Sequence, residues 1–222
     1  MKFWLSIFAL GLTVPTLAQT GPSATESAEV VARALQAKYD LVRDFSADFV
    51  HAYRGGVLHQ TATEQGRLLV KKPGKMRWEY TSPERKVFVS DGRKLYSYLP
   101  QDKQVIVSDV PDEDHATTPA LFLTGKGNLQ RDFTVTYVEL DGVPTGTTIL
   151  KLSPRRREPE YDWLVLAVDP RTLVLRALVT IDSQGGRSTF TFTNLKENVR
   201  IADKEFAFRI PGGVDVITDQ TP

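Results

Sequence analysis

The chain has 222 residues, with 28 Lys and Arg against 27 Asp and Glu, and it contains no cysteine. A balanced charge gives no broad field to attract nucleic acid or acidic membranes, so neither is expected as the main ligand. Without cysteine there are no disulfides and no thiolate metal ligands, and a domain of about 200 residues must depend on its hydrophobic core.

The first eighteen residues have the layout of a secretory signal peptide. Lys2 gives a positive start, residues 3–12 are mostly apolar, and Pro15 breaks the run just before the small residues at Thr16-Leu17-Ala18. No later segment approaches the roughly 20 apolar residues of a membrane helix. We therefore expect residues 1–18 to be cleaved and residues 19–222 to form one exported domain. A retained N-terminal anchor is the alternative.

Residues 26–43 are predicted to form an amphipathic helix. Ser23 and Glu26 have the spacing of a capping box, and apolar residues follow at helical intervals. From Phe45 onward the period changes to two, which favours a strand. Gly55-Gly56 begins a polar excursion that we expect to last until Gln65.

Strand signals then recur at short intervals, often separated by Asp-Gly or Gly-Gly turns. The predicted strands are residues 66–71, 75–80, 86–90, 95–99, 104–108, 133–140, 147–153, 164–169, 174–181, 188–194 and 207–210. This meander predicts a mainly β (α+β) fold built on a strongly curved antiparallel sheet.

Residues 118–125 interrupt the strands with a short, nearly all-apolar helix. Thr118 is its expected N-cap, Pro119 lies in its first turn, and Gly125 ends it. Such a helix needs a surface to cover, and the concave face of the sheet is the expected one.

Groups that would carry catalysis or bind a metal are sparse. His51, His59 and His115 lack zinc-binding spacing, and there is no Gly-x-Ser-x-Gly motif or complete phosphate-binding loop. The acidic run at residues 112–114 has the character of a solvated loop. The basic run at residues 155–157 has two interpretations, a solvated loop or a docking point for an acidic partner. We expect no enzyme, no metal and no cofactor.

Residues 66–80 instead indicate an apolar surface. The alternation places Leu68 and Val70 on the same face as Lys72, and it places Met76 and Trp78 together on the next strand. An ordinary core under a helix is one interpretation. Two short helices cover so large a sheet poorly, however, and an exposed apolar concavity usually marks a binding site. The expected cavity residues are Phe49, Tyr53, Leu68, Val70, Met76, Trp78, Phe88, Leu121, Phe122 and Leu123.

These pieces, in this order, resemble the periplasmic outer-membrane lipoprotein carrier family of the Lol sorting pathway. The resemblance runs through nearly the whole mature chain. Its parts are the signal peptide, the first helix leading to residues 45–49, the Lys-Pro-Gly-Lys-Met-Arg-Trp-Glu-Tyr segment, residues 89–92, Thr118-Pro119 and the ending at residues 206–217.

The resemblance implies an unclosed half-barrel whose apolar concave side is lidded by the N-terminal helix and the short mid-chain helix. It implies that acyl chains of a lipoprotein displace this lid. It also implies loading by an inner-membrane ATP-driven transporter, unloading to an outer-membrane receptor lipoprotein, and a monomeric carrier.

One departure concerns the lid latch that the resemblance implies. The family commonly has Arg-Pro where this chain has Lys72-Pro73, and that arginine ties the sheet to lid-helix carbonyls. Lys72 could do the same, facing Tyr39 on the first helix and Leu123 or Thr124 on the second. An ammonium offers three donors instead of a planar fork of five, so the latch is expected to be looser.

Two other functions use the same half-barrel. One is a carrier of free lipid or glycolipid, and the other is an envelope-stress sensor or adaptor. An enzyme would need a convergent polar cluster within the cavity, for which Lys72 is the one candidate found in the sequence.

Overall fold

A single twelve-stranded sheet dominates the computed structural model, which describes residues 26–55, 60–110, 123–125, 127–158 and 161–218. The strand order is β12-β6-β5-β4-β3-β2-β1-β11-β10-β9-β8-β7. The strands are β1 (Asp44–Arg54), β2 (Thr61–Lys71), β3 (Lys75–Ser82), β4 (Lys86–Asp91), β5 (Lys94–Leu99), β6 (Gln104–Asp109), β7 (Phe133–Tyr137), β8 (Thr148–Pro154), β9 (Trp163–Val168), β10 (Leu175–Ile181), β11 (Arg187–Glu197) and β12 (Asp215–Thr218).

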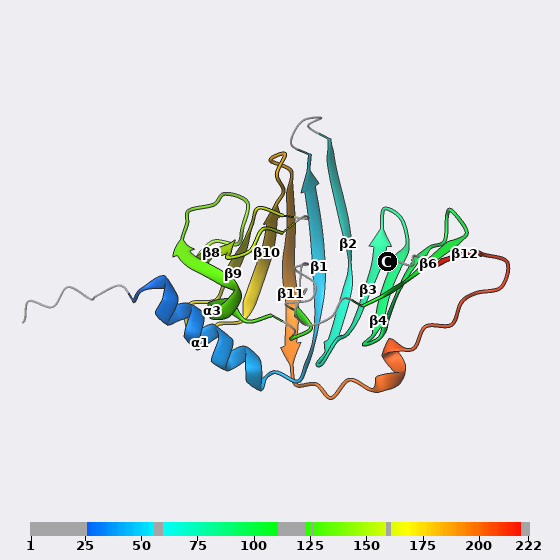
Figure 1. Cartoon of the computed structure of the whole chain (residues 1–222), viewed down its shortest axis with the longest axis horizontal. Helices are drawn as coiled ribbons and strands as arrows, with labels where there is room; N and C mark the ends of the chain where they lie inside the picture. Colours follow the sequence, from blue (N-terminus) through cyan, green and yellow to red (C-terminus); the bar gives the residue numbers. More distant parts are fainter. Residues whose placement is uncertain (1–25, 56–59, 111–122, 126, 159–160, 219–222) are drawn as a thin grey trace, which may run out of the picture.

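The sheet is curved and does not close, because β7 and β12 remain as its two edges (Figure 1). Every pair of neighbouring strands is antiparallel except β12 and β6, which run parallel. The expected mainly β, unclosed half-barrel with an N-terminal helix against it is therefore confirmed. The parallel pair at the edge is a departure from the uniformly antiparallel sheet that the turns predicted.

Helix α1 (Ala28–Leu41) lies along one end of the sheet, near the starts of β1 and β10 (Figure 1). Its N-cap is Ser27 and not the predicted Ser23: the Ser27 hydroxyl accepts from the Val30 N–H, and the helix begins two residues after its predicted start at residue 26. Ala28, Ala32 and Leu35 are buried on one stripe of the helix, which matches the spacing of a helix that packs on one face.

Three further predictions of secondary structure need correction. The polar stretch before Gln65 is already strand, since β2 begins at Thr61 and pairs in register with all of β1. Residues 207–210 are not a strand: they follow a 3₁₀ turn, η2 (Asp203–Phe206), and Phe208 packs on Tyr96 at 5.3 Å between ring centroids. A short helix, α3 (Leu129–Asp132), was not predicted.

The predicted apolar helix over residues 118–125 lies mostly outside the described residues. Within the described part, Leu123, Thr124 and Gly125 form a turn against the sheet, and the side chains of Leu123 and Thr124 are each 1% exposed.

The C-terminal segment covers the face of the sheet opposite to α1. Asp203 in η2 forms ion pairs with Lys71 at 2.6 Å and Lys75 at 3.1 Å, and Phe206 is 1% exposed. The sheet is thus packed on both faces, as expected for a strand pattern in which both sets of alternating side chains include apolar residues. None of the described helices is long and apolar enough to span a bilayer.

Candidate functional site: a latched lid over an apolar concave face

The turn between β2 and β3 brings Lys72 to the C-terminal end of α1. The Lys72 ammonium donates a hydrogen bond to the Tyr39 carbonyl, and its nitrogen lies 3.5 Å from the centroid of the Tyr39 ring. Carbonyls of the last helical turn have no partner within the helix, and the helix dipole favours a cation there. The position of Lys72 is therefore electrostatically suited to holding α1.

The same tyrosine connects α1 to the turn at residues 123–125. The Tyr39 hydroxyl donates to the Leu123 carbonyl, and the Gly74 N–H donates to the Thr124 carbonyl at 3.2 Å. Gly125 has φ +83°, and a Cβ there would lie 2.7 Å from Lys72 Cδ. A side chain at this position would displace the lysine, so glycine is required both by the backbone angle and by the space.

Burial and nearby charges shift the pKa values of Lys72 and Tyr39. Burial lowers the pKa of Lys72 to about 8, although Asp40 and Glu197 oppose the shift by attracting the ammonium. Burial, reinforced by the charge of Glu197, raises the pKa of Tyr39 above its ordinary range. At neutral pH Lys72 is thus charged while Tyr39 remains a neutral donor.

The concave face of β1, β2 and β3 carries a cluster of aromatic side chains. The Phe49 ring lies edge-on to Trp78 at 5.0 Å and to Tyr80 at 4.9 Å, and Phe190 of β11 lies 5.1 Å from Trp78. These edge-to-face contacts add stability beyond burial alone. The predicted residues Leu68, Val70 and Met76 surround the cluster and are 0%, 1% and 8% exposed.

The remaining predicted cavity residues differ in how deeply they are buried. Phe88 is partly buried and packs against the core, and Leu123 is buried beside the latch. Tyr53 is 38% exposed toward the end of β1, so it lies at the rim and not within the core. Leu121 and Phe122 lie outside the described residues.

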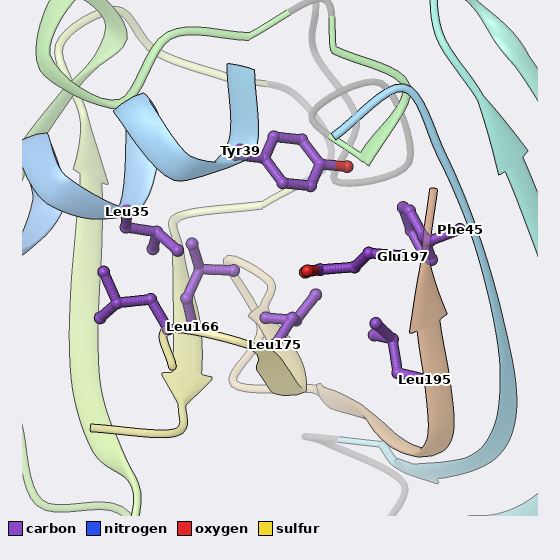
Figure 2. A pocket seen from close by; sticks show the side chains of 8 residues that line it. Leu35, Tyr39, Phe45, Leu166, Leu175, Leu195 and Glu197 are labelled. Atoms are coloured by element: carbon purple, nitrogen blue, oxygen red, sulfur yellow. The ribbon is translucent and has the colours of Figure 1, made fainter. Parts of the chain in front are cut away.

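A second apolar group, absent from the predicted cavity, lies directly beneath α1. Figure 2 shows Leu35 and Tyr39 of α1 facing Leu166 and Leu175 of β9 and β10, with Leu195 of β11 beside them. The gap that they leave has a volume of about 20 Å³, which is room for about one water molecule. Predicted strands over residues 164–169 and 174–181 already contained Leu166 and Leu175, and their alternation could have identified them.

Together these contacts describe an apolar concave face with α1 packed against it, and polar contacts of Lys72 and Tyr39 at the C-terminal end of that helix. The space beneath α1, between the helix and β9, β10 and β11, is filled, so an apolar ligand could enter there only if α1 moved. Within the described residues, no group of three or more His, Asp or Glu side chains could hold a metal ion.

Comparison with a solved structure places this architecture in a known class. An uncharacterized conserved protein from Thermus thermophilus superposes with a TM-score of 0.54 at 12% identity, over 86% of this chain and 99% of that one. At this identity the match concerns the fold alone. It defines the class as open, curved β-sheets with a helix packed against the concave side.

Sequence comparison identifies the family within that class. The model of the outer membrane lipoprotein carrier protein LolA matches residues 40–209. An outer-membrane lipoprotein carrier protein of Chromohalobacter salexigens is 32% identical over 99% of both chains. A carrier of the same name from Pseudomonas fluorescens is 32% identical over 94% of this chain and 97% of its own. The chain belongs to the LolA outer membrane lipoprotein carrier family.

Proposed function

We propose that this protein is a periplasmic carrier that binds the acyl chains of lipoproteins released from the inner membrane and delivers them to an outer-membrane receptor. The observation that carries the proposal is an apolar concave face closed by a lid whose latch is polar. Apolar packing fills the face while no ligand is bound, and an acyl chain can replace that packing. Family membership and the names of the relatives support the same function.

The energetics require an energised loading partner. Burying acyl chains stabilises by about 0.8 kcal/mol per CH₂, so removing a multiply acylated protein from a bilayer costs tens of kcal/mol. The concave face can offset much of this cost but cannot drive the transfer. We therefore propose an inner-membrane ATP-driven transporter as the source of the cargo and an outer-membrane receptor lipoprotein as the acceptor, with the carrier acting as a monomer.

The latch has a strength suited to reversible opening. A hydrogen bond from a charged group is worth about 1.5–3 kcal/mol, and the contact of Lys72 with the Tyr39 ring adds about 0.5–2 kcal/mol. Desolvation of Lys72, evident in its lowered pKa, opposes that gain, so the sum of these contributions is an upper limit on the strength of the latch. About four buried CH₂ groups would then outweigh the latch. The lid would close the empty carrier without preventing loading.

In this proposal the predicted residues have two roles. Lys72, Tyr39 and Thr124 form the latch, and the aromatic and aliphatic side chains from Phe49 to Trp78 form the floor on which acyl chains lie. Residues 1–18 are proposed to be removed as a signal peptide, which leaves residues 19–222 as the single carrier domain.

The test is to co-produce the mature chain with a triacylated lipoprotein and purify it without detergent. We expect a soluble complex in which mass spectrometry detects the intact triacylated lipoprotein. A carrier of free lipid would instead yield phospholipid or glycolipid alone. Recovery of free lipid alone, or of the empty carrier, would overturn the proposed function.

A further inference from the structure

A chain of polar side chains crosses the concave face at the end of the sheet remote from the latch. His51 Nε2 lies 2.5 Å from the Ser188 hydroxyl, and His51 Nδ1 lies 3.3 Å from Glu64 Oε2. Lys86 forms an ion pair with Glu64 at 2.5 Å. These four residues, here called the His51 cluster, come from β1, β11, β2 and β4.

The cluster directly adjoins the apolar floor. The His51 ring stacks on Phe190 at 4.1 Å with an interplanar angle of 8°, and it lies 6.1 Å from the Tyr80 ring. The side chains of His51 and Glu64 are only 16% and 15% exposed. An amphiphile on this face would therefore lie on apolar side chains along β1 and reach the polar groups of the His51 cluster at this end.

One hydrogen-bonding group in the cluster is unsatisfied. Among the described residues, buried His51 Nδ1 has no partner that meets hydrogen-bond geometry, and its nearest polar contact is Glu64 Oε2 at 3.3 Å, which interacts with the ring mainly as a charge. A buried polar group without a partner is costly and is expected to have a reason. Burial lowers the pKa of His51 against the attraction of Glu64, with Lys86 adding to the lowering, so the ring is neutral at neutral pH and holds one N–H donor.

The spacing along the sheet matches the length of an acyl chain. His51 lies six positions after Phe45, which is at the end of β1 nearest the latch, and this separation corresponds to about 20 Å of strand. Each half of a bilayer's hydrocarbon core is about 15 Å thick. Figure 1 shows that α1 lies near the start of β1, whereas the end of β1 and the start of β2 lie at the opposite end of the sheet.

We propose that the His51 cluster receives the ester-linked diacylglyceryl end of the ligand, so that the acyl chains run from His51 toward Lys72. This inference rests on the proposed carrier function and adds an orientation and a chemical preference to it. Ester carbonyls are acceptors without charge, and the His51 ring N–H and the Lys86 ammonium are donors that can reach them. Glu64 disfavours a ligand that ends in a free carboxylate.

Hydrolysis of the bound ester is not part of the proposal. The order Ser188–His51–Glu64 resembles a hydrolytic triad, yet Ser188 lies within β11 and is paired with Tyr53 on one side and Thr180 on the other. An oxyanion hole needs hydrogen-bond donors that converge on the reacting carbonyl, and the backbone N–H groups that often supply them must be free of other partners. A residue within a continuous ladder on both sides does not provide that arrangement.

The experiment compares ester-linked and ether-linked forms of the same ligand, since the ether lacks the carbonyl. One pair is a lipopeptide with a dipalmitoyl thioglyceryl cysteine and its dialkyl ether analogue. We expect wild-type protein to bind the ester about five- to tenfold more tightly, the effect of one satisfied buried hydrogen bond. His51→Phe keeps the stack on Phe190 and should remove the preference, whereas His51→Gln, which keeps a donor, should restore part of it.

Val50→Phe is the matched control, because Val50 is the neighbouring residue on the opposite face of β1 and is 42% exposed. It should retain the full ester preference. A second ligand pair is dipalmitoyl phosphatidylglycerol and its dialkyl ether analogue. The pair in which the ester binds more tightly than the ether identifies the source of the diacylglyceryl group as lipoprotein or phospholipid. Equal binding of ester and ether in both pairs would overturn the subsite and leave the carrier function intact. If the wild-type protein bound none of the four ligands, the carrier function itself would be overturned.

Discussion

The pKa of Lys72 makes lid opening dependent on pH, with a sign opposite to that of a simple charged latch. In the closed protein this pKa is about 8, and in water it returns to about 10.5. Between these values the closed state has released a proton that the open state still holds. Opening then requires proton uptake, so the closed state gains stability as the pH rises through this window. Below about pH 8 both states are protonated and the dependence disappears.

The size of the effect follows from the same two values. The difference between 10.5 and about 8 corresponds to about 3 kcal/mol in the limit of complete burial. Lys72 is only partly buried, and solvent screening reduces the expected effect to about 1–2 kcal/mol. The equilibrium for opening should therefore shift roughly five- to thirtyfold between about pH 8 and pH 10.

An uncharged apolar dye that becomes fluorescent on the concave face measures this equilibrium. Its affinity for the wild-type protein should fall as the pH rises through the window. In Lys72→Arg this fall should be absent, because the guanidinium stays charged, and ionisation of Tyr39 in the open state can only raise the affinity at the upper end of the window. A flat profile for the wild-type protein, or the same slope in Lys72→Arg, would refute the link between Lys72 and the lid.

Two substitutions test the latch and the floor separately. Gly125→Ala places a Cβ 2.7 Å from Lys72 Cδ at φ +83° and should favour opening by about 1–2 kcal/mol more than Gly185→Ala, where φ is +76° but no atom lies within 4 Å. Equal dye affinities in the two variants would mean that glycine is needed at position 125 only for its positive φ and not to leave space for Lys72. Trp78→Glu should abolish lipid binding, since the carboxylate would need desolvation, while the exposed control Thr63→Glu should not. Unchanged binding in a folded Trp78→Glu would place the ligand on the other face.

The alternation of residues 66–80 was sufficient to predict the inward face of the sheet. Leu68, Val70, Met76 and Trp78 are all buried on the concave side, because a strand that packs on one face repeats every two residues. Lys72 falls on the same face by the same rule, and the structure places its ammonium at the Tyr39 carbonyl.

Other features of the secondary structure could not be predicted from the local sequence pattern. β2 extends back to Thr61 although its first residues are polar, because pairing with β1 supplies the hydrogen bonds that hydrophobic burial does not. The segment at residues 207–210 alternates like a strand, yet Phe208 packs across Tyr96 and the ladder forms later, at β12. Both outcomes are decided by partners distant in the sequence.

The His51 cluster shows the same limit for the site. Its members lie on four strands, and His51 and Ser188 are separated by 137 positions. Each one alone is an ordinary polar residue in a strand pattern. Only the strand order, in which β1 lies between β2 and β11, brings them together.

The central claim is that acyl chains of a lipoprotein lie on the concave face of the sheet. Photo-crosslinking tests it most directly, with a benzophenone side chain placed either at Phe49, which is 2% exposed on that face, or at the adjacent Val50, which is 42% exposed on the other. After co-production with a triacylated lipoprotein, we expect a crosslink to the acyl chains from position 49 and none from position 50. Crosslinking from position 50 alone, or equally from both, would contradict the account.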